Sequence, residues 1–154
     1  MIDYRLFITP LFFFAIIATM IHIYQHLPHQ RDKQLGHIDP SNGRVYGQRL
    51  GPDKYIGRVD YEEGKVYASR LGPDEYLGRV DKHGHIYAHQ LGPDRYVARI
   101  ESDGKLYRHI PHGRDTYLGS LENMRHPVEG AAAFFFFFKE AAESPQDDNK
   151  SASQ

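Results

Sequence analysis

The chain has 154 residues, a formal net charge of -1 and no cysteine. This length is enough for one modest domain with appendages, but too short for two full-sized domains. The near-neutral charge argues against a general nucleic-acid binder, and the lack of cysteine excludes disulfides, thiolate metal sites and a cysteine nucleophile. All nine phenylalanines lie in residues 7–14 and 134–138, so the two ends differ in composition from the middle.

Residues 6–24 form an uncharged, largely apolar run after a short leader at residues 1–5. As a helix, this run would span roughly 28 Å, close to the ~30 Å hydrocarbon core of a bilayer. We predict a retained transmembrane anchor. A cleaved signal peptide and a buried helix are the alternatives, although the run is longer than the apolar region of about 7–15 residues that typifies a signal peptide.

The charges that flank this run are nearly balanced, with Arg5 before it and Arg31 and Lys33 after it. The short leader favours a single-pass signal-anchor that leaves the rest of the chain outside the cytoplasm. Residues 25–33 are polar and contain Pro28, and they lack apolar periodicity. We therefore expect them to form a juxtamembrane linker.

A repeat of about 20 residues occupies residues 34–128. Its main motif begins Leu-Gly-Pro-Asp at Leu50, Leu71 and Leu91, and a degenerate copy covers residues 111–121. A second motif, Gly-x-Val/Ile/Leu-Tyr, alternates with the first and begins at Gly43, Gly64, Gly84 and Gly104. Repeats of fixed period indicate an architecture built from copies of one small unit.

Each unit is predicted to be a β-hairpin, because two short alternating runs are separated by turn residues. Asp81–Gly84 fits a type I turn followed by glycine in the left-handed region. Gly-Pro-Asp supplies a second turn, with its aspartate as a local cap. We predict an all-β antiparallel meander of about nine strands, closed into a rosette or barrel-like form because open sheet edges are a liability.

The turn also predicts the pairing of strands, with Val80 opposite Ile86, Arg79 opposite Tyr87 and Gly78 opposite Ala88. Alternation along a strand then gives one aliphatic face with small residues and one face of arginine and tyrosine. Arginine beside tyrosine favours cation–π stacking. The candidate binding residues on this second face are Arg58, Arg79, Arg99, Tyr67, Tyr87 and Tyr107.

The apolar segment at residues 129–139 includes five consecutive phenylalanines. It is too short to span a bilayer as a helix. We expect it to pack on the glycine and alanine positions of the repeat domain. A membrane-dipping or partner-binding patch and an aggregation-prone segment are the alternatives. Periodicity does not distinguish helix from strand in this run. The polar tail at residues 140–154 is predicted to be disordered.

The units of form Gly-Arg-Val-Asp-x-x-Gly-x-Val/Ile-Tyr, followed by a Gly-Ala-Ala-plus-apolar run, resemble bacterial tandem β-hairpin proteins called β-flower proteins. The resemblance covers residues 34–138 and is carried by Gly78, Arg79, Val80, Asp81, Gly84, Ile86, Tyr87 and their copies, with Gly130 to Phe138. It implies hairpins arranged like petals around an axis. It brings no catalytic residues to this chain. The phenylalanine run and the N-terminal apolar segment depart from the family pattern.

No arrangement in the sequence indicates catalysis, a metal site or a cofactor. The positions that match His85 and His89 are Lys65 and Ser69 in one copy and Lys105 and His109 in another, so the histidine pair does not recur. Repeated use of one motif also argues against catalysis, which needs different residues in one place. We expect a membrane-anchored, non-enzymatic module that binds an unknown protein partner or self-assembles, and does not bind nucleic acid. The alternative is an envelope glycan- or choline-binding module that uses the arginine and tyrosine face.

Overall fold

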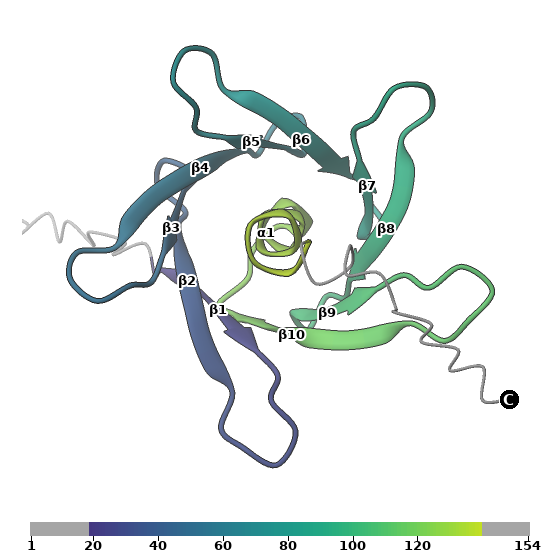
Figure 1. Ribbon diagram of the computed structural model, residues 1–154, viewed down its shortest axis with the longest axis horizontal. Helices are drawn as coiled ribbons and strands as arrows, with labels where there is room; N and C mark the ends of the chain where they lie inside the picture. Colours follow the sequence, from purple (N-terminus) through teal and green to yellow (C-terminus); the bar gives the residue numbers. More distant parts are fainter. Residues whose placement is uncertain (1–18, 140–154) are drawn as a thin grey trace, which may run out of the picture.

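The structure, a computed structural model, describes residues 19–139, which form a closed antiparallel barrel of ten strands around a central helix (Figure 1). The strands are β1 (Ile21–Gln25), β2 (Lys33–Asp39), β3 (Arg44–Gly47), β4 (Lys54–Asp60), β5 (Lys65–Ala68), β6 (Glu75–Val80), β7 (His85–Ala88), β8 (Arg95–Ile100), β9 (Lys105–Arg108) and β10 (Thr116–Glu122). The central helix is α1 (Pro127–Ala133), followed by the π-helix η1 (Phe134–Phe138).

Each strand pairs with the next in the chain, and β1 pairs with β10 to close the ring. Outer loops that project from the ring alternate with short inner turns (Figure 1). We call each outer loop with its two strands a petal, numbered 1 to 5 from β1–β2 to β9–β10. The petal tips are residues 26–32, 48–53, 69–74, 89–94 and 109–115. Because neighbouring strands run antiparallel, all tips lie at one end of the barrel and all inner turns at the other.

The pairing predicted from the repeat is confirmed. Between β6 and β7, Gly78 pairs with Ala88, Arg79 with Tyr87 and Val80 with Ile86. The inner turn between them closes as predicted, since the Gly84 amide donates to the Asp81 carbonyl at 3.1 Å and Gly84 has φ of +83°. A left-handed backbone of this kind favours glycine. The aliphatic face is buried, which confirms the predicted face assignment.

The phenylalanine run packs inside the barrel on the glycine positions of successive petals. A Cβ placed on Gly36 would come within 2.6 Å of Phe137 Cζ, and one on Gly78 within 2.5 Å of Phe135 Cζ. Phe136 lies over Gly57 in the same way. Phe135, Phe136 and Phe137 therefore contact petals 3, 2 and 1 in turn. This confirms the expectation that residues 129–139 pack on the repeat domain, and it shows that the run is helical.

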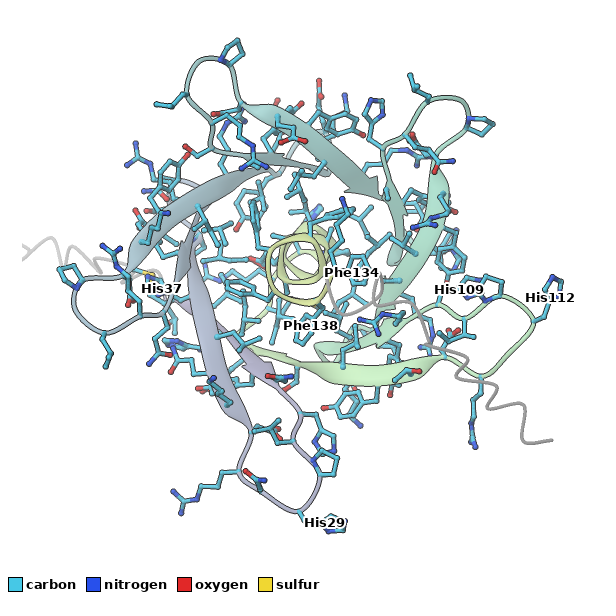
Figure 2. All side chains as sticks on the ribbon, viewed as in Figure 1. His29, His37, His109, His112, Phe134 and Phe138 are labelled. Atoms are coloured by element: carbon cyan, nitrogen blue, oxygen red, sulfur yellow. The ribbon has the colours of Figure 1, made fainter. Side chains whose placement is uncertain are left out.

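The π-helical form of η1 suits a ring of five petals. In an α-helix, residues four apart lie on the same face, so five consecutive rings would point in fewer than five directions. The i→i+5 bonding of a π-helix widens the turn and spreads five consecutive side chains around it. Figure 2 shows Phe134 and Phe138 on the central helix inside the ring. The wider turn lets neighbouring phenylalanines reach neighbouring petals.

The structure corrects the predicted boundary of the N-terminal anchor. Residues 21–24, which we assigned to the end of a transmembrane helix, lie in β1, and Ile21 and Ile23 are fully buried in the barrel core. The physical reason is ring closure: without β1, β2 and β10 would each keep an unpaired edge. The meander therefore has ten strands, where nine were predicted.

Residues 25–33, predicted to be a juxtamembrane linker, instead belong to petal 1. Gln25 ends β1, Lys33 begins β2, and the residues between them form the petal tip. Within residues 19–139, no helix is long and apolar enough to cross a membrane. The leader at residues 1–5, residues 6–18 of the predicted anchor and the predicted tail at residues 140–154 lie outside the described residues.

Candidate functional site

The structure brings the six residues predicted on the arginine and tyrosine face together as three separate pairs, one at each of three petal junctions. Each arginine lies over the ring of the tyrosine on the adjacent strand. The distances from Cζ to the ring centroid are 4.3 Å for Arg58–Tyr67, 4.4 Å for Arg79–Tyr87 and 4.0 Å for Arg99–Tyr107. Because each pair crosses an inner turn, it joins two neighbouring petals. The predicted cation–π stacking is confirmed.

Each of these arginines also binds the aspartate of the next petal tip. The Nε–Oδ2 distances are 2.9 Å for Arg58–Asp74, 3.0 Å for Arg79–Asp94 and 3.0 Å for Arg99–Asp115. Between petals 1 and 2, His37 takes the place of arginine: it stacks on Tyr46 and lies 3.3 Å from the Asp53 carboxylate. We call this arrangement the inter-petal clasp. It fixes the base of the tips of petals 2 to 5 to the preceding petal.

The clasp gives the Gly-Pro-Asp aspartates a role beyond the predicted local turn cap. At Asp115 both roles are present, since Oδ1 accepts from the Ile110 amide at 3.2 Å while Oδ2 accepts from Arg99. Burial would raise the pKa of the Asp115 carboxyl, but hydrogen bonds from Arg99, the Ile110 amide and His109 outweigh it and hold this pKa below its usual value. The charged form of Asp115 is the one that the clasp stabilises.

The clasp leaves the arginines and tyrosines little capacity for a ligand. Each arginine charge is matched by an aspartate, and one face of each tyrosine is covered. An exposed ion pair stabilises by about 0–1 kcal/mol and an exposed cation–π pair by about 0.5–1 kcal/mol. Repeated between petals, these small energies hold the tips in place. The six predicted binding residues thus have a structural explanation.

Several histidines join the same outer surface. His89 lies against Tyr76 and His109 stacks on Tyr96 at 4.2 Å between ring centroids. His109 Nδ1 is also 3.1 Å from Asp115 Oδ1. Among residues 19–139, no group of three or more histidine, aspartate or glutamate side chains is placed to hold a metal ion. These histidines act here as aromatic and hydrogen-bonding surface groups.

The petal tips carry the most exposed apolar side chains of the described structure. Leu50, Leu71 and Leu91 have relative exposures of 102%, 106% and 102%, so they touch almost nothing within their own chain. They occupy the same repeat position on petals 2, 3 and 4, which are neighbours in the ring. We did not single them out from sequence. The signal was available, because each leucine recurs just before a Gly-Pro turn and outside the alternating strand pattern.

Petals 1 and 5 have a second type of tip. Their sequences are Leu27-Pro-His29 and Ile110-Pro-His112, and both histidines have a positive φ, 62° and 60°. Figure 2 shows His29 and His112 at the outer ends of these two petals. The leucine and isoleucine of this type are partly buried. The three fully exposed leucines therefore mark one arc of the ring, formed by petals 2 to 4.

Comparisons with protein-family models, with curated proteins and with solved structures find no match to this chain.

Proposed function

We propose that this protein is a non-catalytic, membrane-anchored module whose petal tips bind a protein partner. The observation that carries the proposal is the complete exposure of Leu50, Leu71 and Leu91 at equivalent positions. Single exposed apolar residues are common on proteins, but the recurrence of one fully exposed leucine at the same position of three neighbouring petals is the argument for an interaction site. The clasp holds each leucine on an ordered tip, so little conformational entropy is lost when a partner binds.

A protein partner with several apolar pockets suits this arc of tips. Each leucine gains roughly 1.5–3 kcal/mol when it is fully buried, which is weak for one tip. Three tips on one rigid ring bind with avidity, because the first contact holds the other two close to their pockets. The resemblance to β-flower proteins stays a prediction about family, and it adds no ligand to this proposal. A second copy of the chain is the self-assembling form of the same proposal.

The repeat supports a non-catalytic role. Each clasp uses an aspartate, a tyrosine and an arginine or histidine, and the three arginine clasps repeat one geometry from petal to petal. Catalysis needs residues with different roles that converge on one reacting group. A clasp repeated with one geometry suits a scaffold that presents several equivalent tips.

We place the chain at the membrane through the uncharged residues that precede β1. The described chain enters the ring at its inner-turn end, since Ile21 pairs with Ile38 beside an inner turn. An anchor at this end would leave the petal tips facing away from the bilayer. Residues 19 and 20 are not helical, and residues 6–18 would span roughly 20 Å as a helix, less than the ~30 Å hydrocarbon core. This short length favours the cleaved leader as the alternative.

Replacement of the three leucines by serine should abolish partner binding without loss of the fold. We expect Leu50→Ser, Leu71→Ser and Leu91→Ser together to weaken capture by about 1,000-fold, from at least 1.5 kcal/mol lost at each tip. The stability of the variant should change by less than about 0.5 kcal/mol at each position, because the side chains touch nothing. The immobilised full-length chain is used to capture proteins, which are identified and quantified by mass spectrometry. Titration with the purified partner then measures the affinity of the wild type and of the variant.

The control changes the residue that precedes each leucine: Arg49→Ser, Arg70→Ser and Gln90→Ser together should capture the partner normally. Sedimentation of the purified chain distinguishes self-assembly from a different partner. Equal capture by the leucine variant and the wild type would refute the role of the tips. Resistance of the chain to alkaline extraction from membranes tests the anchor, and release into the soluble fraction would mean that the leader is cleaved.

The glycan- or choline-binding alternative ranks second. Its support was the array of tyrosines on the outer face, and tyrosine pairs such as Tyr87–Tyr96 do lie 5.7 Å apart. Arg79 covers the Tyr87 ring, however, and His109 stacks on Tyr96. An aromatic cage needs open ring faces, which these contacts reduce.

A further inference from the structure

One inward-facing position breaks the repeat. The last inward-facing residue before the tip is Gly47 in petal 2, Ala68 in petal 3 and Ala88 in petal 4, but it is Gln25 in petal 1 and Arg108 in petal 5. The Arg108 Nη2 group donates to the Phe138 carbonyl at 2.9 Å. Its Nε group is buried and has no hydrogen-bond partner among the described residues. Petals 2 to 4 fold with a small residue at this position, and Arg108 is the one charged residue found there among the five petals, so the arginine needs another explanation.

Arg108 lines a pocket of about 260 Å³ between petals 4 and 5, at the tip end of the barrel. Two further cations, Arg95 and Lys139, line the same pocket, and among residues 19–139 no acidic residue does. Within the described part of the chain, none of these three cations forms an ion pair. The rest of the lining is aromatic or largely apolar and includes Val97, Ile110 and Phe134.

The groove over petals 2 and 3 shows how unusual this pocket is. Ala68 stands there at the position of Arg108, and Lys54 stands at the position of Arg95. The basic residue of its tip, Arg70, is neutralised by Glu75 at 2.7 Å. Lys139 lines both pockets, so each is lined by three basic residues, but only the groove over petals 2 and 3 also has an acidic residue, Glu75. The pocket between petals 4 and 5 therefore has the greater excess of positive charge.

Leaving a guanidinium partly buried without a counter-ion is costly. Burial lowers the pKa of Arg108, in keeping with this cost. A carboxylate would offset it, because its two oxygens can accept a pair of hydrogen bonds from one guanidinium. The apolar part of such a ligand would pack against the apolar side chains that line the pocket. The volume lies just below the roughly 300–1,000 Å³ of typical ligand pockets, which favours a small ligand.

We propose that the pocket between petals 4 and 5 binds a small carboxylate with an apolar body. The carboxylate binds Arg108, with Arg95 and Lys139 beside it, and the apolar body packs on Val97, Ile110 and Phe134. This site is separate from the leucine arc, so it does not depend on the partner-binding proposal.

Hexanoate is a suitable probe, with hexanamide as its uncharged match and inorganic phosphate as an anion without an apolar body. Titration of the full-length chain, labelled with ¹⁵N-arginine, should shift the Arg108 Nε–H signal with hexanoate and not with hexanamide. Arg108→Ala should weaken hexanoate binding at least tenfold and raise the melting temperature of the free protein, since alanine is the residue found in petals 3 and 4. Lys54→Ala, at the Arg95 position of the other groove, should bind hexanoate as the wild type does.

Other outcomes would overturn the proposal. They are no hexanoate binding at all, equal binding by the Arg108→Ala variant, or binding of hexanamide as tight as that of hexanoate. Phosphate that binds as tightly as hexanoate would refute the apolar half of the site. A full-length variant with Glu140, Glu143, Asp147 and Asp148 changed to their amides tests the chain's own tail as the occupant. Hexanoate binding only in that variant would assign the pocket to the tail and overturn an external ligand.

Discussion

Replacement of Phe135 by alanine is expected to destabilise the protein by about 3–5 kcal/mol, the usual cost of removing a large buried aromatic ring. Phe135 is 6% exposed, and its ring fills the space over Gly78 that a larger residue at position 78 would otherwise occupy. The petals cannot close this space, because the closed barrel fixes their distance from the central helix. The midpoint of urea unfolding of the full-length chain measures the loss.

Phe137→Ala is the matched control for this prediction. Phe137 lies in the same π-helix and over an equivalent glycine, Gly36, but it is only partly buried. Removal of the Phe137 ring should reduce the free energy of unfolding by roughly half as much as Phe135→Ala does, since the cavity that it leaves is open to water. Equal losses for the two variants, or a loss below about 1 kcal/mol for Phe135→Ala, would contradict the packing of one phenylalanine on each glycine position.

The second large effect is expected at Glu129, which is fully buried at the start of α1. Its Oε1 accepts from the Arg125 and His126 amides at 2.6 and 2.7 Å, and its Oε2 accepts from the Tyr61 hydroxyl at 3.0 Å. The glutamate thus completes a capping box and also ties the helix to the inner turn between β4 and β5. Burial and the nearby Glu129 carboxylate raise the pKa of Tyr61.

Glu129→Ala is therefore expected to destabilise the fold by about 3–5 kcal/mol, because it removes a fully buried carboxylate, leaves three part-buried donors without this acceptor and opens a cavity beside them. Tyr61→Phe removes only one of the three bonds and should cost about 1 kcal/mol. Glu129→Gln keeps an amide oxygen for the two backbone donors and should fall between them. Urea unfolding of the three variants gives this order. An alanine variant no less stable than Tyr61→Phe would refute the role of Glu129 as the main tie between helix and ring.

The predictions that succeeded depended on local rules. Turn residues such as Asp81 and Gly84 determine which residues face each other in a hairpin, so the register and the buried face followed from sequence. The placement of the phenylalanine run followed from volume, because glycine positions such as Gly57 and Gly78 leave space that the repeat domain itself does not fill. Both arguments need only a turn type or the size of a side chain.

The strand β1 was missed because its composition matches the apolar run before it. Residues 6–24 carry no charge, and that length alone predicted a membrane helix. The sequence carried a signal for this strand, since His22-Ile23-Tyr24 is identical to His85-Ile86-Tyr87 in β7. This cryptic copy supplies the strand that a ring of five petals requires. A short copy of a repeat strand is hard to recognise when the residues before it are also apolar, because the whole run then resembles a membrane helix.

The candidate site was predicted in part. Arginine opposite tyrosine follows from the register, but the aspartate that completes each clasp lies about 16 residues away, as in Arg58–Asp74. Its side chain reaches the arginine only when two petals are placed side by side, which no local rule gives. The exposed leucines and the position of Arg108 likewise depend on which side chains the closed ring leaves uncovered.

Ring closure by β1 is the central claim, because it sets the number of petals, the space for the phenylalanines and the end of the barrel at which the tips lie. Hydrogen–deuterium exchange of the full-length chain, followed by NMR, tests it directly. We expect the amides of His22 and Tyr24 to exchange as slowly as those of β4 and β6, because they lie on the hydrogen-bonding side that faces β10, two and four residues before His26, whose amide donates to the Leu118 carbonyl at 3.0 Å. Exchange of the β1 amides as fast as that of the petal tips, with β2 and β10 behaving as open edges, would contradict the closed ring.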